Sequence, residues 1–302
     1  GELTQITFGD GPDGPPRISK DGQKIIFPKM KMIGQIYTIP ITGGEPKLVI
    51  AGEQTIWWPG ARLSPDGSLV AVNVGDLRGG WVGAESYIQI VDRDGSNIRK
   101  LSVGEWKRKY LDQHSWSPDS KHLAFINTRF MDDTDTFDVY ILNLAKDNQP
   151  KKIARLEKFN ALNWIDSLNL NIKTKNKFYT YNLANDKWSE DTVLYYPIKE
   201  KPEVLVQDLS GDWWIMKDRV RHKLKQPENA QLSLRNLFWT VWGPGIPFRT
   251  ISLIDGKIKE YPKLIGPKLF GGYYYSDEGK EIIYSTREFV GQISMIENPF
   301  ME

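Results

Sequence analysis

The segment Leu63-Ser64-Pro65-Asp66-Gly67 decides the fold of this chain, because it places three turn-forming residues directly before a hydrophobic strand. Pro presets φ at the first central position of a turn, Asp hydrogen-bonds its own backbone, and Gly accepts a positive φ. The segment therefore predicts a tight hairpin between two strands. Related turns precede hydrophobic strands elsewhere, at Ser19-Lys20-Asp21-Gly22, Ser117-Pro118-Asp119-Ser120 and Ser276-Asp277-Glu278-Gly279.

A second pattern follows these turns and consists of an alternating strand, a polar turn and another strand. The clearest example contains the turn Asp92-Arg93-Asp94-Gly95, and further examples occupy residues 35–45 and 138–148. Each unit therefore supplies four antiparallel strands, with a period of about 40 to 50 residues. This period is typical of β-propeller blades rather than of a β-sandwich.

The repeat predicts an all-β chain that forms a single β-propeller domain over residues 1–302. A unit at 159–194 keeps the pattern without the turn signal, and residues 195–266 are interpreted as two short blades, which gives seven blades in all. One long blade with an insertion near 225–229 would give six. The last unit lacks a fourth strand, and residues 2–8 can supply it, which would close the ring and remove two exposed edges. The four clear units occupy residues 16–52, 58–104, 112–156, and 268–302 with 1–9.

Composition excludes several classes of protein. The 40 basic and 38 acidic residues give a net charge of +2, which provides no general attraction to nucleic acid or anionic membrane. The absence of cysteine rules out disulfides and thiolate-bound zinc. No stretch approaches the ~20 apolar residues of a membrane-spanning helix. The sequence starts at Gly1-Glu2-Leu3-Thr4 without a signal-peptide pattern, as a mature or trimmed chain would.

No motif in the sequence predicts a catalytic centre or a cofactor. A serine nucleophile would be expected in a Gly-x-Ser-x-Gly elbow, which does not occur, and Ser64 belongs to a turn. The segment beginning at Asp92 starts like a calcium loop, but Val103 stands where the bidentate Glu belongs. A weak metal candidate is the acidic loop with Asp132, Asp133 and Asp135, although such clusters are usually only solvated. We expect no cofactor, and an enzyme is the less favoured class.

Aromatic and arginine residues cluster at strand entries and in the connections between second and third strands, which open onto one face of a propeller. Trp and Tyr beside Arg form typical anchors for a protein partner or a sugar, whereas the alternative is that these aromatics pack between blades. His114 is interpreted as a hydrogen-bonded channel residue rather than as a base. Trp116, Trp213, Trp214 and Trp239 are expected in the core. The predicted ligand-binding residues are Trp57, Trp58, Arg62, Arg78, Trp81, His114, Arg129, Tyr274 and Arg287.

Three segments resemble the TolB-type propeller repeats of bacterial periplasmic proteins: Leu3-Thr4-Gln5-Ile6-Thr7, Leu63-Ser64-Pro65-Asp66-Gly67 with its following strand, and Ile90-Val91-Asp92-Arg93-Asp94-Gly95-Ser96-Asn97. The resemblance implies a propeller fold, a periplasmic or extracellular location and a protein partner. Similar blades occur in propellers of dipeptidyl-peptidase-like hydrolases and in oligogalacturonate lyases. TolB-like proteins also carry a small α/β domain before the propeller, and the hydrolases carry an α/β-hydrolase domain; this sequence contains neither pattern.

These observations favour a non-enzymatic, monomeric propeller that binds a protein or peptide partner on its funnel face. Two alternatives remain open at this point. One is a carbohydrate-active enzyme similar to a uronate lyase, with Trp57, Trp81 and His114 around a sugar. The other is the propeller module of a larger hydrolase-type assembly.

Overall fold

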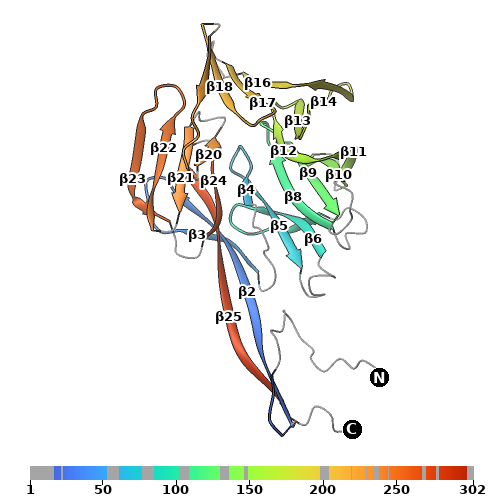
Figure 1. Cartoon of the computed structure of the whole chain (residues 1–302), viewed down its shortest axis with the longest axis vertical. Coiled ribbons are helices and arrows are strands. Elements are labelled where there is room, and N and C mark those ends of the chain that lie inside the picture. Colours follow the sequence, from blue (N-terminus) through green and yellow to red (C-terminus); the bar gives the residue numbers. More distant parts are fainter. Residues whose placement is uncertain are drawn as a thin grey trace.

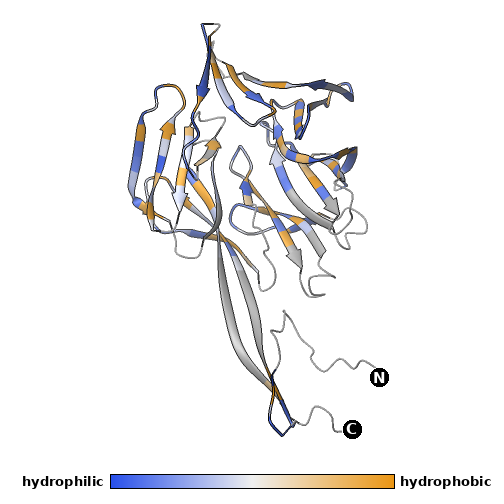
Figure 2. Ribbon diagram, in the orientation of Figure 1, coloured by the Kyte–Doolittle hydropathy of each residue, from blue (hydrophilic) through white to orange (hydrophobic). Residues whose placement is uncertain are grey.

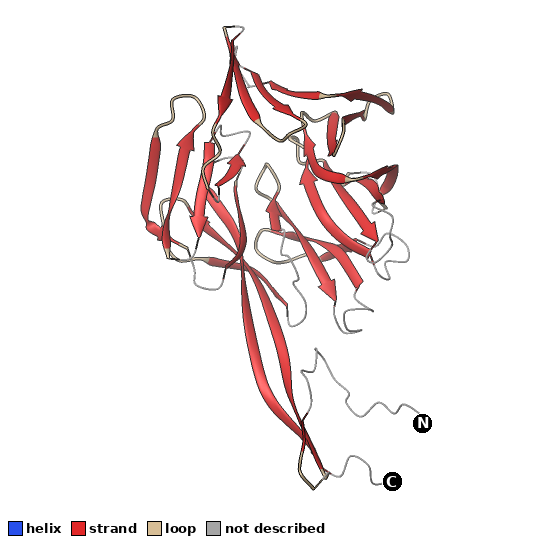
Figure 3. Ribbon diagram, viewed as in Figure 1, coloured by secondary structure: helices blue, strands red, loops and turns tan. Residues whose placement is uncertain are grey.

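The computed structural model describes most of the chain and shows a ring of antiparallel sheets (Figures 1 and 3). The part that it describes contains strands, turns and no helix, so it contains no helix that could cross a lipid bilayer. The described residues are 17–21, 23–52, 61–76, 85–101, 109–129, 136–145, 149–197, 204–218, 220–228, 230–233, 238–243, 245–266, 270–276 and 279–297.

Five blades follow one another along the chain, and each is a four-stranded antiparallel sheet with its strands paired in sequence order. Blade 1 contains β4 (Ala61–Leu63), β5 (Leu69–Asp76), β6 (Glu85–Asp92) and β7 (Arg99–Leu101). Blade 2 contains β8 (Lys109–Trp116), β9 (His122–Arg129), β10 (Thr136–Asn143) and β11 (Lys151–Glu157). Blade 3 contains β12 (Phe159–Trp164), β13 (Asn169–Thr174), β14 (Phe178–Asn182) and β15 (Lys187–Asp191). Blade 4 contains β16 (Val193–Pro197), β17 (Val204–Asp208), β18 (Trp213–Lys217) and β19 (Val220–Leu224). Blade 5 contains β20 (Ala230–Ser233), β21 (Phe238–Gly243), β22 (Ile246–Ser252) and β23 (Ile258–Ile265).

The sixth blade is assembled from both ends of the chain. Its strands are β24 (Phe270–Tyr275) and β25 (Glu281–Glu297), followed in the sheet by β2 (Lys24–Pro40) and β3 (Lys47–Gly52). The short β1 (Arg17–Ile18) pairs with β2 near its start. Two strands from each end therefore close the ring.

The described residues form six blades, so the expectation of seven is wrong and the alternative of six is confirmed. Residues 195–266 do form two blades, and the error lies elsewhere. Residues 16–52 and 268–302 were counted as two blades, whereas β2 and β25 pair with each other and make one. The segment expected to close the ring, residues 2–8, lies outside the described residues.

The pairing of β2 with β25 continues well beyond the blade. Both strands are 17 residues long, whereas β3 pairs only with residues 34–38 of β2 and β24 only with residues 282–286 of β25. Residues 24–33 and 288–297 therefore form an arm that projects from the ring (Figure 1). The arm is two-stranded except where β1 pairs with residues 25–26. The arm leaves the blade at the end where the second and third strands are connected in the other blades.

Apolar side chains fill every seam between neighbouring blades. One core cluster joins blades 6 and 1 through Ile36, Val70 and Ile283, and another joins blades 1 and 2 through Ile90 and Phe125. Further clusters join blades 2 and 3, blades 3 to 5, and blades 5 and 6. The hydropathy colouring follows this arrangement, with apolar residues along the central strands (Figure 2). Burial on all six seams holds the ring closed.

The predicted turn has the predicted chemistry. The Ser64 hydroxyl donates to the Asp66 carboxylate at 2.6 Å, and the Leu69 amide donates to the Ser64 hydroxyl at 2.9 Å. Gly67 adopts a φ of +73°. Burial alone would raise the pKa of Asp66, but hydrogen bonds from Ser64 and its other serine neighbours lower it. Because the Asp66 amide also donates to Ser120 at 3.0 Å, the turn connects blade 1 to blade 2.

Indole groups connect the inner strands of neighbouring blades. The Trp116 Nε1 donates to the Arg62 carbonyl at 3.0 Å, and the Trp164 Nε1 donates to the Ser115 carbonyl at 2.9 Å. Trp116, Trp164 and Trp239 are buried, as was expected for Trp116 and Trp239. Each such bond satisfies a buried backbone carbonyl while the ring fills the seam.

Replacing Trp116 with alanine should lower the free energy of unfolding by about 3 to 5 kcal/mol, because a buried ring and an interblade hydrogen bond are lost together. Urea denaturation followed by far-ultraviolet circular dichroism measures this change. Trp188→Ala is the matched control, because Trp188 lies on an outermost strand and is 37% exposed. An equal loss in both variants would contradict a specific role for Trp116 in the seam.

Candidate binding site at the inner strands

Three of the predicted ligand-binding residues lie on adjacent inner parts of the ring. Tyr274 is on β24 of blade 6, Arg62 is on β4 of blade 1, and His114 is on β8 of blade 2. Strand β24 lies beside β4, and β8 lies beside β5 of blade 1. The structure therefore brings together residues that are far apart in the sequence. Outside the described residues or side chains lie Trp57, Trp58, Arg78, Trp81, Arg129 and Arg287, together with the acidic residues Asp132, Asp133 and Asp135.

Arg62 is held in place by Tyr274. Its guanidinium carbon lies 4.3 Å from the centroid of the Tyr274 ring, and its Nη2 donates to the Tyr274 hydroxyl at 3.3 Å. Both side chains are half-buried. A cation–π contact combined with a hydrogen bond restricts the arginine to one orientation, and this bond uses one of the five N–H donors of a guanidinium.

His114 is a neutral, almost fully buried imidazole. Only 2% of the residue is exposed, and burial, together with the positive charge of Arg62, lowers its pKa to about 3. A hydrogen bond to the Ala71 backbone opposes this shift. Because this bond favours the protonated ring, the imidazole donates it to the backbone carbonyl of Ala71. The ring nitrogen in that bond therefore carries the proton. The other, Nε2, has no hydrogen-bond partner among the described residues.

Two asparagines that the sequence analysis did not single out lie in the same seam. Ala71 of β5 belongs to the cluster between blades 1 and 2, so Asn73, two residues further along the strand, points to the same side. By the same alternation, Asn127 lies on the side of β9 that carries Phe125. Phe125 is the residue that pairs with His114, whereas Asn127 pairs with Leu111. Both asparagines are buried. Their signal in the sequence is a single amide that follows a run of four apolar residues in a central strand.

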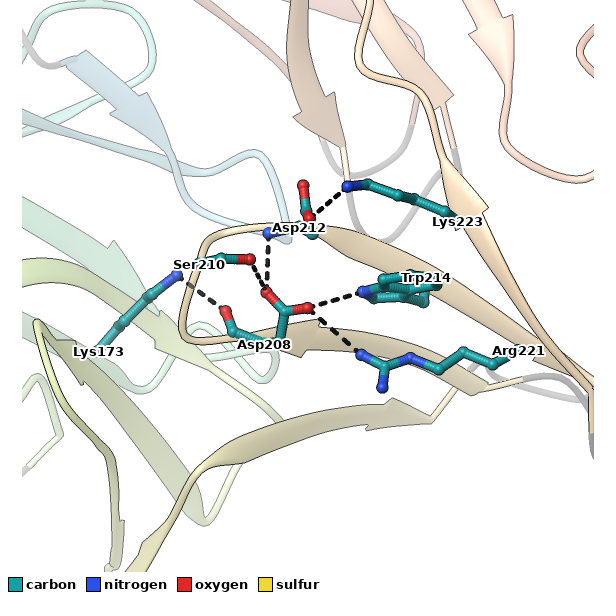
Figure 4. A network of polar contacts seen from close by, with 7 residues as sticks. All are labelled: Lys173, Asp208, Ser210, Asp212, Trp214, Arg221 and Lys223. Atoms are coloured by element: carbon teal, nitrogen blue, oxygen red, sulfur yellow. Dashed lines mark hydrogen bonds and ion pairs between the residues drawn. The ribbon is translucent and has the colours of Figure 1, made fainter.

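A second polar network lies between blades 3 and 4 (Figure 4). Lys173 is 3% exposed and donates to the Asp208 carbonyl at 3.2 Å; burial lowers its pKa, against the opposing charge of Asp208. The Asp208 carboxylate accepts from the Trp214 Nε1 at 2.9 Å, and Arg221 lies 4.2 Å from the Trp214 ring centroid. Burial alone would raise the pKa of Asp208, but its hydrogen bonds lower it. Because its members bond to one another, we interpret this network as structural.

The network also corrects the expectation for Trp214. The residue is half-buried and hydrogen-bonded to a carboxylate rather than part of the apolar core. Its neighbour Trp213 is half-buried too, but it packs against the cluster that joins blades 3 to 5. Within the described part of the chain, no three histidine or carboxylate side chains gather as a metal ion would require.

Comparisons with known proteins agree with the fold. No family model matches the sequence, and no curated protein matches it. Among solved structures, the chain is similar to an oligogalacturonate lyase from Vibrio parahaemolyticus, with a TM-score of 0.50 and 9% identity over 89% of this chain and 88% of that one. It is also similar to a putative TolB from Agrobacterium tumefaciens, with a TM-score of 0.40 and 15% identity over 94% and 92% of the two chains. The β-propeller domain of the Trilobed protease from Pyrococcus furiosus matches with a TM-score of 0.46 and 13% identity over 81% and 100%.

At these identities the comparisons describe the fold alone. The class that the structure defines is a six-bladed β-propeller of antiparallel sheets. The propeller fold that the resemblance to TolB-type repeats implied is confirmed by the blades of the structure.

The burial of His114 predicts a stability that falls on acidification. Its pKa is about 3 in the folded chain and near 6.5 when unfolded, so between these values the unfolded chain binds more protons and acid favours unfolding. Between pH 6.5 and pH 5, protonation of His114 in the unfolded chain should lower the free energy of unfolding by about 2 kcal/mol. Urea denaturation across this range should therefore show a steeper loss for the wild type than for His114→Gln. Parallel curves for the two proteins would contradict a buried, neutral His114.

Proposed function

We propose that this chain is a non-enzymatic binding propeller that takes a peptide segment of a protein partner at the inner strands of blades 6, 1 and 2. The observation that carries the proposal is the Arg62–Tyr274 pair, a half-buried cation fixed by an aromatic ring beside a neutral, buried imidazole. A fixed guanidinium loses little conformational entropy when it binds a carboxylate or a carbonyl. We place the protein in the periplasm or outside the cell, following its resemblance to periplasmic propellers.

The chemistry of His114 supports binding over catalysis. A general base works best when its pKa is near the operating pH, whereas His114 has a pKa of about 3. It is also shielded from solvent. It would therefore be a poor base for proton abstraction from a sugar acid.

Selection of peptides from a random display library against the purified protein tests the proposal. We expect enrichment of sequences with an acidic residue or a carboxyl terminus, since Arg62 offers the charge. Arg62→Gln should weaken the selected peptides at least tenfold, because truncating one partner of a partly desolvated ion pair costs about 2 kcal/mol or more. Fluorescence polarisation measures the change in affinity.

Arg249→Gln is the matched control. Arg249 pairs with Glu260 between the outer strands of blade 5, so its loss should leave peptide affinity unchanged. Equal binding by the Arg62 and Arg249 variants would contradict the proposed site.

The second candidate function is a carbohydrate-active enzyme, which is favoured by the similarity of the fold to an oligogalacturonate lyase. Incubation with uronate oligosaccharides and a divalent metal distinguishes the two. Unsaturated product that depends on His114 would replace the binding proposal by a lyase. We expect none to form. A third possibility is a propeller module within a larger hydrolase-type assembly. Such a module would give the same results as a binding propeller in the peptide selection and in the incubation with oligosaccharides.

A further inference from the structure

The seam between blades 1 and 2 contains hydrogen-bonding groups that the fold itself leaves unused. The Nε2 of His114 and both the Oδ1 and Nδ2 of Asn127 are buried and have no hydrogen-bond partner among the described residues. His114 is 2% exposed and Asn127 is 3% exposed. Buried polar groups without partners destabilise a fold. Two such residues in one seam therefore indicate a role other than stabilising the ring.

The register places the two side chains next to each other. His114 pairs with Phe125, and Asn127 follows Phe125 by two residues on the same side of β9. The seam around them is apolar, with Trp116, Phe125 and Ala71 in one core cluster. A ligand group here therefore meets two polar partners within an apolar wall.

The hydrogen-bonding pattern is specific. Because His114 donates its one ring proton to the Ala71 backbone, its Nε2 is a pure acceptor. Asn127 adds one acceptor, Oδ1, and one donor, Nδ2. The two residues together call for a ligand with two N–H or O–H donors and one acceptor on a single group.

Charge and shape exclude the other ligand groups. A carboxylate has no N–H or O–H donor and would place its lone pairs against two acceptors. An ammonium group would be repelled by Arg62, whose charge already acts on His114. A hydroxyl has only one donor and would leave an acceptor of the pair unsatisfied. A primary carboxamide, planar with two N–H donors and one carbonyl, matches all three atoms.

We propose that His114 and Asn127 form a specificity pocket for the carboxamide side chain of an asparagine or glutamine in the bound peptide, an inference that rests on the proposed function. The carboxamide N–H groups donate to His114 Nε2 and Asn127 Oδ1, and its carbonyl accepts from Asn127 Nδ2. Arg62, which is half-buried on the neighbouring inner strand, contacts an acceptor group of the peptide outside the pocket. The unused atoms are covered in this structure, so the ligand enters only when the side chains that cover them move aside.

Nuclear magnetic resonance of the histidine ring nitrogens tests the pocket directly, because the chain has only three histidines. Acetamide should shift the His114 Nε2 resonance saturably, and the signals of His122 and His222 serve as internal controls. N,N-dimethylacetamide, which has no donor, should leave the resonance unchanged, as should acetate and ethylene glycol. A response to acetate or ethylene glycol equal to that of acetamide would overturn the assignment to a carboxamide. No response to any probe would show that the pocket holds water only and would overturn the proposal.

Asn127→Leu provides an independent readout. Replacing an unsatisfied buried amide by an apolar group of similar size should leave the melting temperature unchanged or raise it, while acetamide binding falls at least fivefold. A marked drop in melting temperature would mean that the amide is bonded within the fold, which would overturn the proposal.

The two proposals fail in different ways. If selected peptides depend on Arg62 but acetamide leaves His114 unchanged, only the pocket is wrong. If acetamide shifts His114 but no peptide depends on Arg62, the pocket stands as a carboxamide site and the peptide-binding function is wrong.

Discussion

Burial of both faces of every sheet is the constraint on which this structure depends. In β5, Val70 and Val72 face blade 6 while Ala71 faces blade 2, so successive residues of one strand enter two different core clusters. A sheet that is apolar on both faces is stable only between two others, and a ring provides this for every blade without leaving a terminal face. Hydrophobic burial is non-directional, whereas the interblade hydrogen bonds of Trp116 and Trp164 fix the orientation of one blade against the next.

Polar residues on the central strands stand out against this background, and the structure separates them into two kinds. Lys173 reaches a carbonyl of the next blade and belongs to a network whose members satisfy one another. His114 and Asn127 retain atoms without partners in the described part of the chain. Polar groups that satisfy one another, as in the Lys173 network, are compatible with a stable seam. Polar atoms without partners lower stability and are typical of sites selected for binding.

The fold could be predicted from the sequence because the turn chemistry around Ser64 and Ser117 is local and repeats. The number of blades could not be predicted in the same way, since the pairing of β2 with β25 joins opposite ends of the chain and no local pattern records it. Arg62, Tyr274 and His114 could be selected together because each lies shortly before such a turn, and equivalent positions become neighbours in a ring. Trp214 was misassigned because strand alternation does not reveal the carboxylate of Asp208 at the seam. Asn127 was missed because one amide in an apolar strand has the same pattern whether it is satisfied or not.

The divided sixth blade imposes an order on biosynthesis. As the chain leaves the ribosome, β2 and β3 are made before the five contiguous blades, but their partners β24 and β25 are made after them. The five contiguous blades can form hairpin by hairpin from contacts of low sequence separation, which fold fastest. The long strand β2 must meanwhile remain unpaired with β25 through the synthesis of those five blades. Ring closure therefore waits until β25 has been made, and the nascent hairpin of β2 and β3 is the part of the ring that a chaperone has most reason to protect.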